Sequence, residues 1–165
     1  DKKVYPANDN ADLQVVISGL KIDIENSLDI FLKNGAKKAI QLSVSAPFHC
    51  PLMQPAKEIM GETLKSINLL EPIVPIVSNV TVESNNVTGK IKDNLINQVT
   101  EMVRWRETMA RFNNNGVIDY IEIGSGAVLS NLAKRSCPSF NRRPVNDKAS
   151  VESFLSYLDN EDFND

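Results

Sequence analysis

The chain has 165 residues, of which 42% are hydrophobic and 24% charged, and its formal net charge is −3. This composition predicts a globular chain with a sizeable core and excludes intrinsic disorder, which requires low hydrophobicity together with high net charge. The acidic balance excludes an electrostatic nucleic-acid binder, because such proteins need a basic surface. No apolar run approaches the roughly 18 residues that would span a bilayer, so we expect no membrane partner either.

The two cysteines, Cys50 and Cys137, lie far apart in the sequence, and the chain has one histidine. This spacing is typical of neither a zinc site nor a disulfide framework, and it favours a reducing, cytoplasmic location. One histidine excludes a multi-histidine metal site within the chain, and we predict no metal and no cofactor. The chain begins at Asp1 rather than at a methionine and shows no signal peptide. We therefore expect it to be part of a longer cytoplasmic protein.

The first third of the chain has the pattern of a strand–helix–strand unit. Residues 13–18 form an apolar, strand-like run that ends at Gly19. Apolar residues then recur at helical spacing over residues 21–34, and Gly35 is a suitable residue to end that helix. Residues 39–45 return to a strand pattern.

The remaining elements alternate between helical and strand patterns. We predict a short turn between Pro47 and Pro51, a helix after it, and a helix over 127–135 that follows a glycine turn. The other predicted elements are strands at 73–77 and 120–123, a polar turn at 84–89, helices at 90–103, 105–112 and 151–158, a surface loop at 136–150 and a frayed acidic tail at 159–165. Alternating strands and helices predict an α/β fold with a largely parallel sheet.

His49 is the first candidate for chemistry. It follows a predicted strand, stands between Pro47 and Pro51, and immediately precedes a helix. Sites in α/β folds gather where strands end, and an imidazole that titrates near neutrality is suited to act as a general base. The alternative is a surface or helix-capping histidine. Cys50 should point away from His49 in an extended segment, so we expect a small buried side chain there rather than a nucleophile.

The turn Gly124-Ser125-Gly126 between a strand and a helix resembles a phosphate-binding turn. The third glycine of the dinucleotide fingerprint is absent, because Leu129 stands in its place, and no Walker lysine follows. A tight strand-to-helix turn with close backbone packing is the simpler interpretation. A nucleotide-binding domain remains one hypothesis for this segment.

Three further groups of residues are candidates only. Asn8, Asn10 and Gln14 lie before and within the first predicted strand, and Gln98 lies on an amphipathic helix. Amides of this kind often satisfy backbone groups in loops. A basic group occurs inside the acidic chain at Lys134, Arg135, Arg142 and Arg143. It is either solvated surface or a docking site for an acidic partner.

The segment around His49 resembles a known family. Residues 45–56 read SAPFHCPLMQPA, and the likeness extends over nearly the whole chain in one order. Further matching runs are Asn8-Asp9-Asn10 with Gln14-Val15-Val16-Ile17-Ser18-Gly19, Pro75-Ile76-Val77-Ser78-Asn79-Val80, Gln98-Val99 with Val103-Arg104-Trp105, and Ile123-Gly124-Ser125-Gly126-Ala127-Val128-Leu129 followed by Lys134-Arg135. Together these runs resemble the malonyl-CoA:acyl-carrier-protein transacylases of bacterial type II fatty-acid synthesis. Leu13 and Ser125 depart from the family, which usually has glycine and proline there.

The resemblance implies a position in the family's fold. The chain is similar to the second half of such an enzyme. Residues 1–45 would be the end of a ferredoxin-like small subdomain, and residues 46–158 the C-terminal part of a larger α/β-hydrolase-like subdomain. The first half would hold the serine nucleophile, the arginine that pairs with the malonyl carboxylate, and an oxyanion-hole glutamine. The sequence has no G-x-S-x-G nucleophile motif of its own.

The resemblance also implies roles for single residues. His49 matches the catalytic histidine of a serine–histidine pair, and Gln98 matches the residue whose backbone carbonyl accepts the other ring N–H of that histidine. Asn8 and Asn10 match amides near the substrate cleft. The implied reaction is a ping-pong transfer of malonyl from malonyl-CoA, through the serine, to the phosphopantetheine thiol of acyl carrier protein.

Two hypotheses of function follow from the likeness. In the first, the chain is the histidine-bearing half of an acyltransferase, is inactive alone, and has the missing N-terminal half, malonyl-CoA and acyl carrier protein as partners. In the second, it is a non-catalytic module that docks acyl carrier protein through Lys134, Arg135, Arg142 and Arg143. Nucleophile sequence upstream of this chain would favour the first hypothesis.

Overall fold

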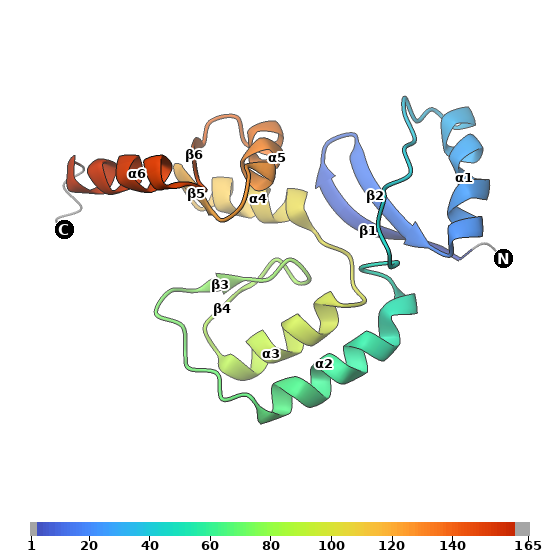
Figure 1. Cartoon of the computed structure of the whole chain (residues 1–165), viewed down its shortest axis with the longest axis horizontal. Helices are drawn as coiled ribbons and strands as arrows, with labels where there is room; N and C mark the ends of the chain where they lie inside the picture. The colour runs from blue at the N-terminus through green and yellow to red at the C-terminus, as the bar shows by residue number, and fades with distance from the viewer. Residues whose placement is uncertain (1–2, 161–165) are drawn as a thin grey trace. The chain divides into compact units, whose positions relative to one another are not determined.

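The computed structural model describes residues 3–160 and divides the chain into two compact units, Asp1–Thr108 and Met109–Asp165. The division falls inside helix α4 (Trp105–Asn114), so this helix contributes its first turn to one unit and the rest to the other. Figure 1 shows the order of the elements from β1 to α6. Of the predicted acidic tail, residues 161–165 lie outside the described residues.

The first unit begins with an antiparallel hairpin of β1 (Val4–Ala11) and β2 (Gln14–Gly19). The strand predicted at 13–18 is thus present, but Leu13 belongs to the turn. Its φ of 65° and 97% exposure are those of a hairpin loop residue. β1 was not predicted, because its polar residues and proline obscure the alternation that marks a strand. Helix α1 (Lys21–Lys33) follows as predicted, and Gly35 after it has a φ of 98°.

The strand predicted at 39–45 does not form among the described residues. Ile40, Leu42 and Val44 do alternate with polar residues, but all three side chains are exposed. A strand requires a neighbour for its backbone N–H and C=O groups, and no described segment pairs with this one. Residues 3–45 are therefore a hairpin, a helix and an irregular segment, rather than a strand–helix–strand unit.

Two helices dominate the rest of the first unit. The short helix η1 (Pro51–Met53) leads into α2 (Gln54–Ser66), and α3 (Thr88–Gln98) packs against α2. In the sequence between α2 and α3, β3 (Ile76–Val77) and β4 (Ser84–Asn85) pair as a two-stranded antiparallel ladder. The predicted helix 90–103 ends five residues early, because residues 99–103 turn back to meet β1. There the N–H of Val103 donates to Ala7 O at 2.8 Å, and the N–H of Asp9 donates to Val103 O at 2.9 Å.

The start of α4 is anchored inside the first unit by Arg104. Its backbone N–H donates to Asn79 O at 2.9 Å and its side chain donates to Val80 O at 3.2 Å. The guanidinium also forms an ion pair with Glu107, and this hydrogen bond lowers the pKa of that carboxyl. The loop after β3 is thereby held against α4.

The second unit is a β–α–β arrangement followed by a helix. β5 (Asp119–Ile123) and β6 (Asn141–Val145) pair in parallel, α5 (Val128–Ser136) connects them, and α6 (Lys148–Asn160) follows. The prediction of a surface loop over 136–150 was wrong, since β6 and the start of α6 lie there. Two arginines and a proline give β6 a sequence that is unusual for a strand.

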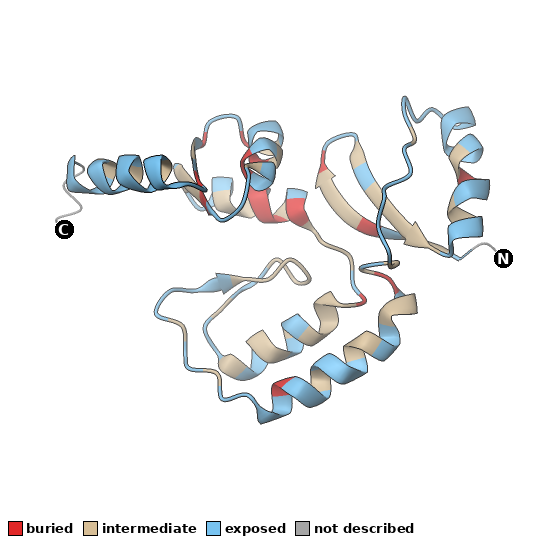
Figure 2. Ribbon diagram, in the orientation of Figure 1, coloured by how far each residue is buried: buried red, intermediate tan, exposed pale blue. Residues whose placement is uncertain are grey.

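The α/β class is confirmed, but the predicted largely parallel sheet is not. The described residues form three two-stranded sheets, and only the β5–β6 pair is parallel. Figure 2 shows the buried residues as a few short red stretches, with pale blue exposed residues along most of α1 and α6. Among the largest fully buried side chains are Met109 and Cys50. The prediction of a buried Cys50 is thereby confirmed.

Candidate active site

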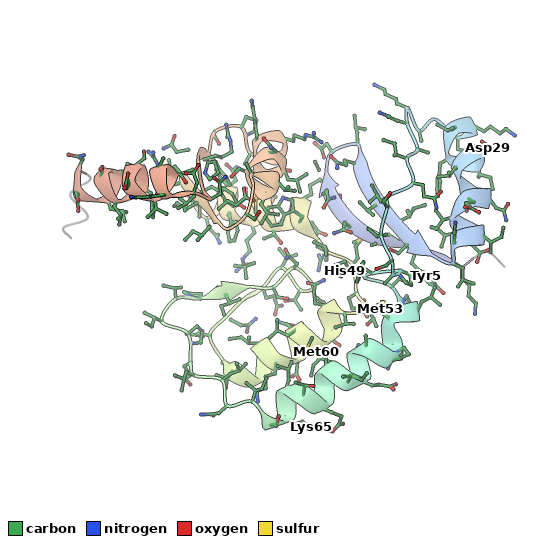
Figure 3. The ribbon with its side chains drawn as sticks, in the orientation of Figure 1. Tyr5, Asp29, His49, Met53, Met60 and Lys65 are labelled. Carbon is green, nitrogen blue, oxygen red and sulfur yellow. The ribbon has the colours of Figure 1, made fainter. Side chains whose placement is uncertain are left out.

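His49 lies in a tight turn where the irregular segment after α1 enters η1 and α2 (Figure 3). Its φ is 57°, in the left-handed region that non-glycine residues rarely adopt. The Sγ of Cys50 donates to Pro47 O at 3.1 Å, and the N–H of Met53 donates to Cys50 O at 3.0 Å. Left-handed backbone at a non-glycine residue costs about 1–3 kcal/mol and persists only where surrounding contacts determine it. Such strain is common at functional turns.

The His49 ring meets the end of α3. Its Nδ1 lies 2.8 Å from the backbone oxygen of Gln98, the last residue of that helix. The final carbonyls of a helix lack intrahelical donors, so Gln98 O is available to accept a bond from outside. Since a carbonyl only accepts, Nδ1 carries the proton in this contact.

A second contact competes for the same nitrogen and is weaker. The side-chain Nε2 of Gln98 lies 3.5 Å from His49 Nδ1, but it also donates to Glu101 O at 3.3 Å. The contact of His49 Nδ1 with the backbone oxygen (2.8 Å) is 0.7 Å shorter than its contact with the side-chain nitrogen (3.5 Å). The shorter contact is the stronger hydrogen bond and therefore decides the tautomer. In the neutral imidazole of His49, the other ring nitrogen, Nε2, then holds a lone pair and can accept a proton. This is the arrangement that a general base requires.

Asn8 and Asn10 lie on β1 in different settings. Asn8 forms a parallel bridge with Val103, five residues after Gln98, so the segment that carries Gln98 is attached to the strand that carries Asn8. Asn10 falls at a register shift between Asp9 and Ala11, where it has no opposite residue on β2. A bulge of this kind re-aims a side chain and is common beside active sites. Their role in binding substrate stays a prediction.

The glycine turn after β5 has a different explanation from close packing. An added Cβ at Gly124 or Gly126 would meet nothing within 4 Å, but their φ values of 144° and 79° favour glycine. The N-terminus of α5 is occupied by the buried Glu122, whose carboxylate accepts from the N–H groups of Leu129 at 2.9 Å and Ser130 at 2.7 Å. A bound phosphate would need these same donors. The nucleotide-binding hypothesis therefore loses its support.

The four basic residues do not share one surface. Lys134 and Arg135 are exposed in the last turn of α5. Arg142 and Arg143 are neighbours on β6 and therefore leave opposite sides of the strand. Arg142 donates to Phe140 O at 2.7 Å and to Pro138 O at 3.1 Å, whereas the Arg143 guanidinium lies 3.6 Å above the Tyr157 ring. Arg142 and Arg143 thus make contacts within the second unit, whereas Lys134 and Arg135 are exposed on α5.

Residues 3–160 contain no group of three or more histidine, cysteine, aspartate or glutamate side chains arranged to hold a metal ion. Within the same residues, no helix combines the length and apolar character that crossing a bilayer requires.

Comparison with known proteins gives this geometry a family context. No protein-family model matches the chain. The malonyl CoA-acyl carrier protein transacylase of Haemophilus influenzae is 38% identical over 155 residues, which are 92% of this chain and 50% of that protein. The transacylase of Bacillus subtilis is 37% identical over 161 residues, 98% of this chain and 51% of that protein. The chain is homologous to malonyl-CoA:acyl carrier protein transacylases.

Solved structures agree with the transacylase homology. The acyl-carrier-protein-S-malonyltransferase of Bartonella henselae matches with a TM-score of 0.89 and 41% identity over 94% of this chain and 50% of its own. A malonyl-transacylase solved in complex with its type II polyketide acyl-carrier protein matches with a TM-score of 0.90 and 38% identity, again over 50% of that chain. The present chain thus spans about half the length of the transacylases it matches.

Proposed function

We propose that this chain is the C-terminal, histidine-bearing half of a malonyl-CoA:acyl carrier protein transacylase, with His49 as its general base. The observation that carries the proposal is the 2.8 Å contact between His49 Nδ1 and Gln98 O. It holds the ring in the tautomer whose Nε2 can take a proton from a hydroxyl. The hydroxyl would belong to a serine in the other half of the enzyme, since this sequence has no nucleophile motif.

The proposed reaction proceeds in two acyl transfers. In the first, His49 Nε2 takes the serine proton while the serine oxygen bonds to the malonyl thioester carbon. The carbon–sulfur bond then breaks, and the imidazolium gives its proton to the departing thiolate of coenzyme A. In the second, the phosphopantetheine thiol of acyl carrier protein loses its proton to His49 and attacks the malonyl ester. The serine oxygen leaves and recovers that proton.

Gln98 orients the imidazole without adding charge. A carboxylate in that position would also stabilise the imidazolium electrostatically, whereas a backbone carbonyl offers only its dipole. Because the carbonyl belongs to the backbone, substitution of the Gln98 side chain should leave the contact intact. We therefore expect Gln98→Ala to reduce the rate much less than His49→Ala.

A hybrid enzyme tests the proposal. The chain is joined to the half of the Bacillus subtilis transacylase that it does not match, and malonyl transfer to acyl carrier protein is measured. We expect the hybrid to be active and His49→Ala to lower kcat by about 10²–10⁴-fold, the usual contribution of a general base. Cys50→Ser, which keeps a small donor in the same turn, is the matched control. A hybrid that retains full turnover after His49→Ala would contradict the proposal.

Acyl carrier protein is the macromolecular partner in this proposal. Charge complementarity to an acidic partner supports Lys134 and Arg135 as the docking residues, since both are exposed on α5. We expect Lys134→Glu with Arg135→Glu to weaken carrier binding at low salt and to raise KM with little change in kcat. Lys148→Glu is the control, because Lys148 is an exposed lysine on α6 of the same unit. Equal effects of both substitutions, or binding that does not weaken with salt, would contradict this docking site.

A further inference from the structure

The contact between His49 and Gln98 joins two helices at one end. His49 lies two residues before η1, which leads into α2, and Gln98 is the last residue of α3. The distance between Nδ1 and the carbonyl oxygen therefore depends on how α2 lies against the turn after α3. A second cross-link joins the same two segments. The Nζ of Lys57 on α2 donates to Thr100 Oγ1 at 3.3 Å.

Thr100 is built into the turn that presents the Gln98 carbonyl. It lies two residues after Gln98, it is 8% exposed, and its N–H donates to Asn97 O at 3.1 Å. In the same turn, the Gln98 side chain donates to Glu101 O at 3.3 Å. A change in the position of the Thr100 side chain should therefore also move the backbone around Gln98.

Lys57 is placed to hold the other side of the contact. It lies on α2 eight residues after His49, and it is half-buried. A charge-assisted hydrogen bond to a buried hydroxyl is stronger than a neutral one and is less screened than a surface pair. The Lys65 ammonium on the same helix gives the contrast, because it pairs with Glu62 while 72% exposed. Figure 3 labels Lys65 at the far end of α2 from His49.

We propose that Lys57 and Thr100 are positioning residues for His49, acting through a brace between α2 and the turn after α3. The inference rests on the proposed function, and it assigns to two residues a role that the motif around His49 does not include. When the brace is lost, α2 shifts against α3 and the contact between Nδ1 and Gln98 O loosens. The ring then divides between its two tautomers, and only one of them presents a lone pair on Nε2.

Four variants separate the brace from simple packing. Thr100→Val keeps the shape of the side chain but removes the hydroxyl, and Lys57→Met keeps the apolar stem but removes the ammonium. Thr100→Ser restores the hydroxyl and should restore the wild-type behaviour. Lys65→Met is the matched control, since it removes an exposed ammonium from the same helix.

Nitrogen-15 NMR of the imidazole reads the tautomer directly. His49 is the only histidine, so 15N-histidine labelling of the chain gives signals from one ring. The measurement is made on the chain and on the chain assembled with the unlabelled other half from Bacillus subtilis. We expect one Nδ1-protonated tautomer in wild type, Thr100→Ser and Lys65→Met. We expect averaged shifts of the two nitrogens in Thr100→Val and Lys57→Met.

Turnover of the hybrid gives the second readout. Each substitution removes the one hydrogen bond between Lys57 and Thr100. We therefore expect Thr100→Val and Lys57→Met each to lower kcat by about threefold to tenfold, with KM unchanged. The double variant should be no slower than either single one. Wild-type ring shifts in both variants, or a Thr100→Ser that behaves like Thr100→Val, would overturn the brace. Changed ring shifts with unchanged turnover would support the brace and contradict His49 as the base, so the two proposals fail separately.

Discussion

Glu122 on β5 is buried, and its carboxylate accepts hydrogen bonds from two backbone N–H groups of α5. Burial by itself raises the pKa of Glu122, but hydrogen bonds from Ser130 and Leu129 outweigh it, so the pKa lies below its ordinary value. A negative charge at this end also complements the helix dipole. The residue therefore fastens the connection between β5 and α5.

Glu122→Gln should destabilise the fold at neutral pH. We expect a loss of about 1–3 kcal/mol in the free energy of unfolding, because the amide oxygen can keep one neutral bond while the amide NH2 faces the other backbone N–H and leaves it without an acceptor. The measurement is urea unfolding at pH 7. Glu152→Gln is the control, since Glu152 is an exposed residue of α6 and its pair with Lys148 should contribute under about 1 kcal/mol. Equal losses in both variants would contradict the role of Glu122.

The same carboxylate predicts how stability depends on pH. A group whose pKa is lower in the folded state contributes its full stabilisation above the unfolded pKa, which is about 4.3 for glutamate. As the pH falls from that value through the lower folded pKa, the contribution disappears. We therefore expect the stability difference between wild type and Glu122→Gln to be constant from pH 7 to about pH 5 and to shrink below about pH 4.3. A difference that grows on acidification would reverse the inferred sign.

Single residues differed in how well the sequence predicted them. The contact of His49 with Gln98 follows from a motif whose two parts lie 49 residues apart, and only the family resemblance joined them. The sequence did not predict a role for Lys57 or Thr100, because a lysine on a helix and a threonine in a turn are common at protein surfaces. Arg143 was expected on a surface patch, but its position over Tyr157 depends on a strand that the sequence did not reveal.

The elements were predicted best where their pattern is local. Helices α1, α2 and α5 appeared within a few residues of their predicted positions, because apolar periodicity and glycine stops are read directly from the chain. The strand predicted at 39–45 failed for a different reason. A strand depends on its neighbour, and the neighbour is not specified by the strand's own sequence.

Two glycines give an opposed pair of predictions for element stability. At Gly126 there is room for a methyl group, but the φ of 79° strains any other residue, so we expect Gly126→Ala to destabilise by about 1 kcal/mol. Gly89 lies in α3 with equal room, and we expect Gly89→Ala to stabilise by about 0.5–1 kcal/mol. Urea unfolding measures both. Stabilisation by Gly126→Ala would show that the turn adopts another conformation.

The described residues leave an apolar segment on the surface of the first unit. Ile40, Leu42 and Val44 are 62%, 55% and 62% exposed, and the polar residues between them are exposed as well. Several exposed apolar side chains in a segment that pairs with no described strand are typical of a site that another segment covers. The proposed other half of the transacylase is the occupant that fits, because about half the length of the relatives has no counterpart in this chain. A strand from that half could pair with residues 39–45, whose apolar and polar side chains already alternate as in a strand.

Substituting this segment tests the idea of assembly from two halves. We expect the chain alone to self-associate in gel filtration, and the co-expressed other half from Bacillus subtilis to bind it and recover malonyl transfer. Ile40→Thr with Leu42→Thr and Val44→Thr should reduce both self-association and assembly, because the apolar side chains that drive contact are lost. Gln41→Thr with Ser43→Thr, on the intervening positions, should leave both unchanged. Normal assembly of the triple variant would show that the other half covers a different surface.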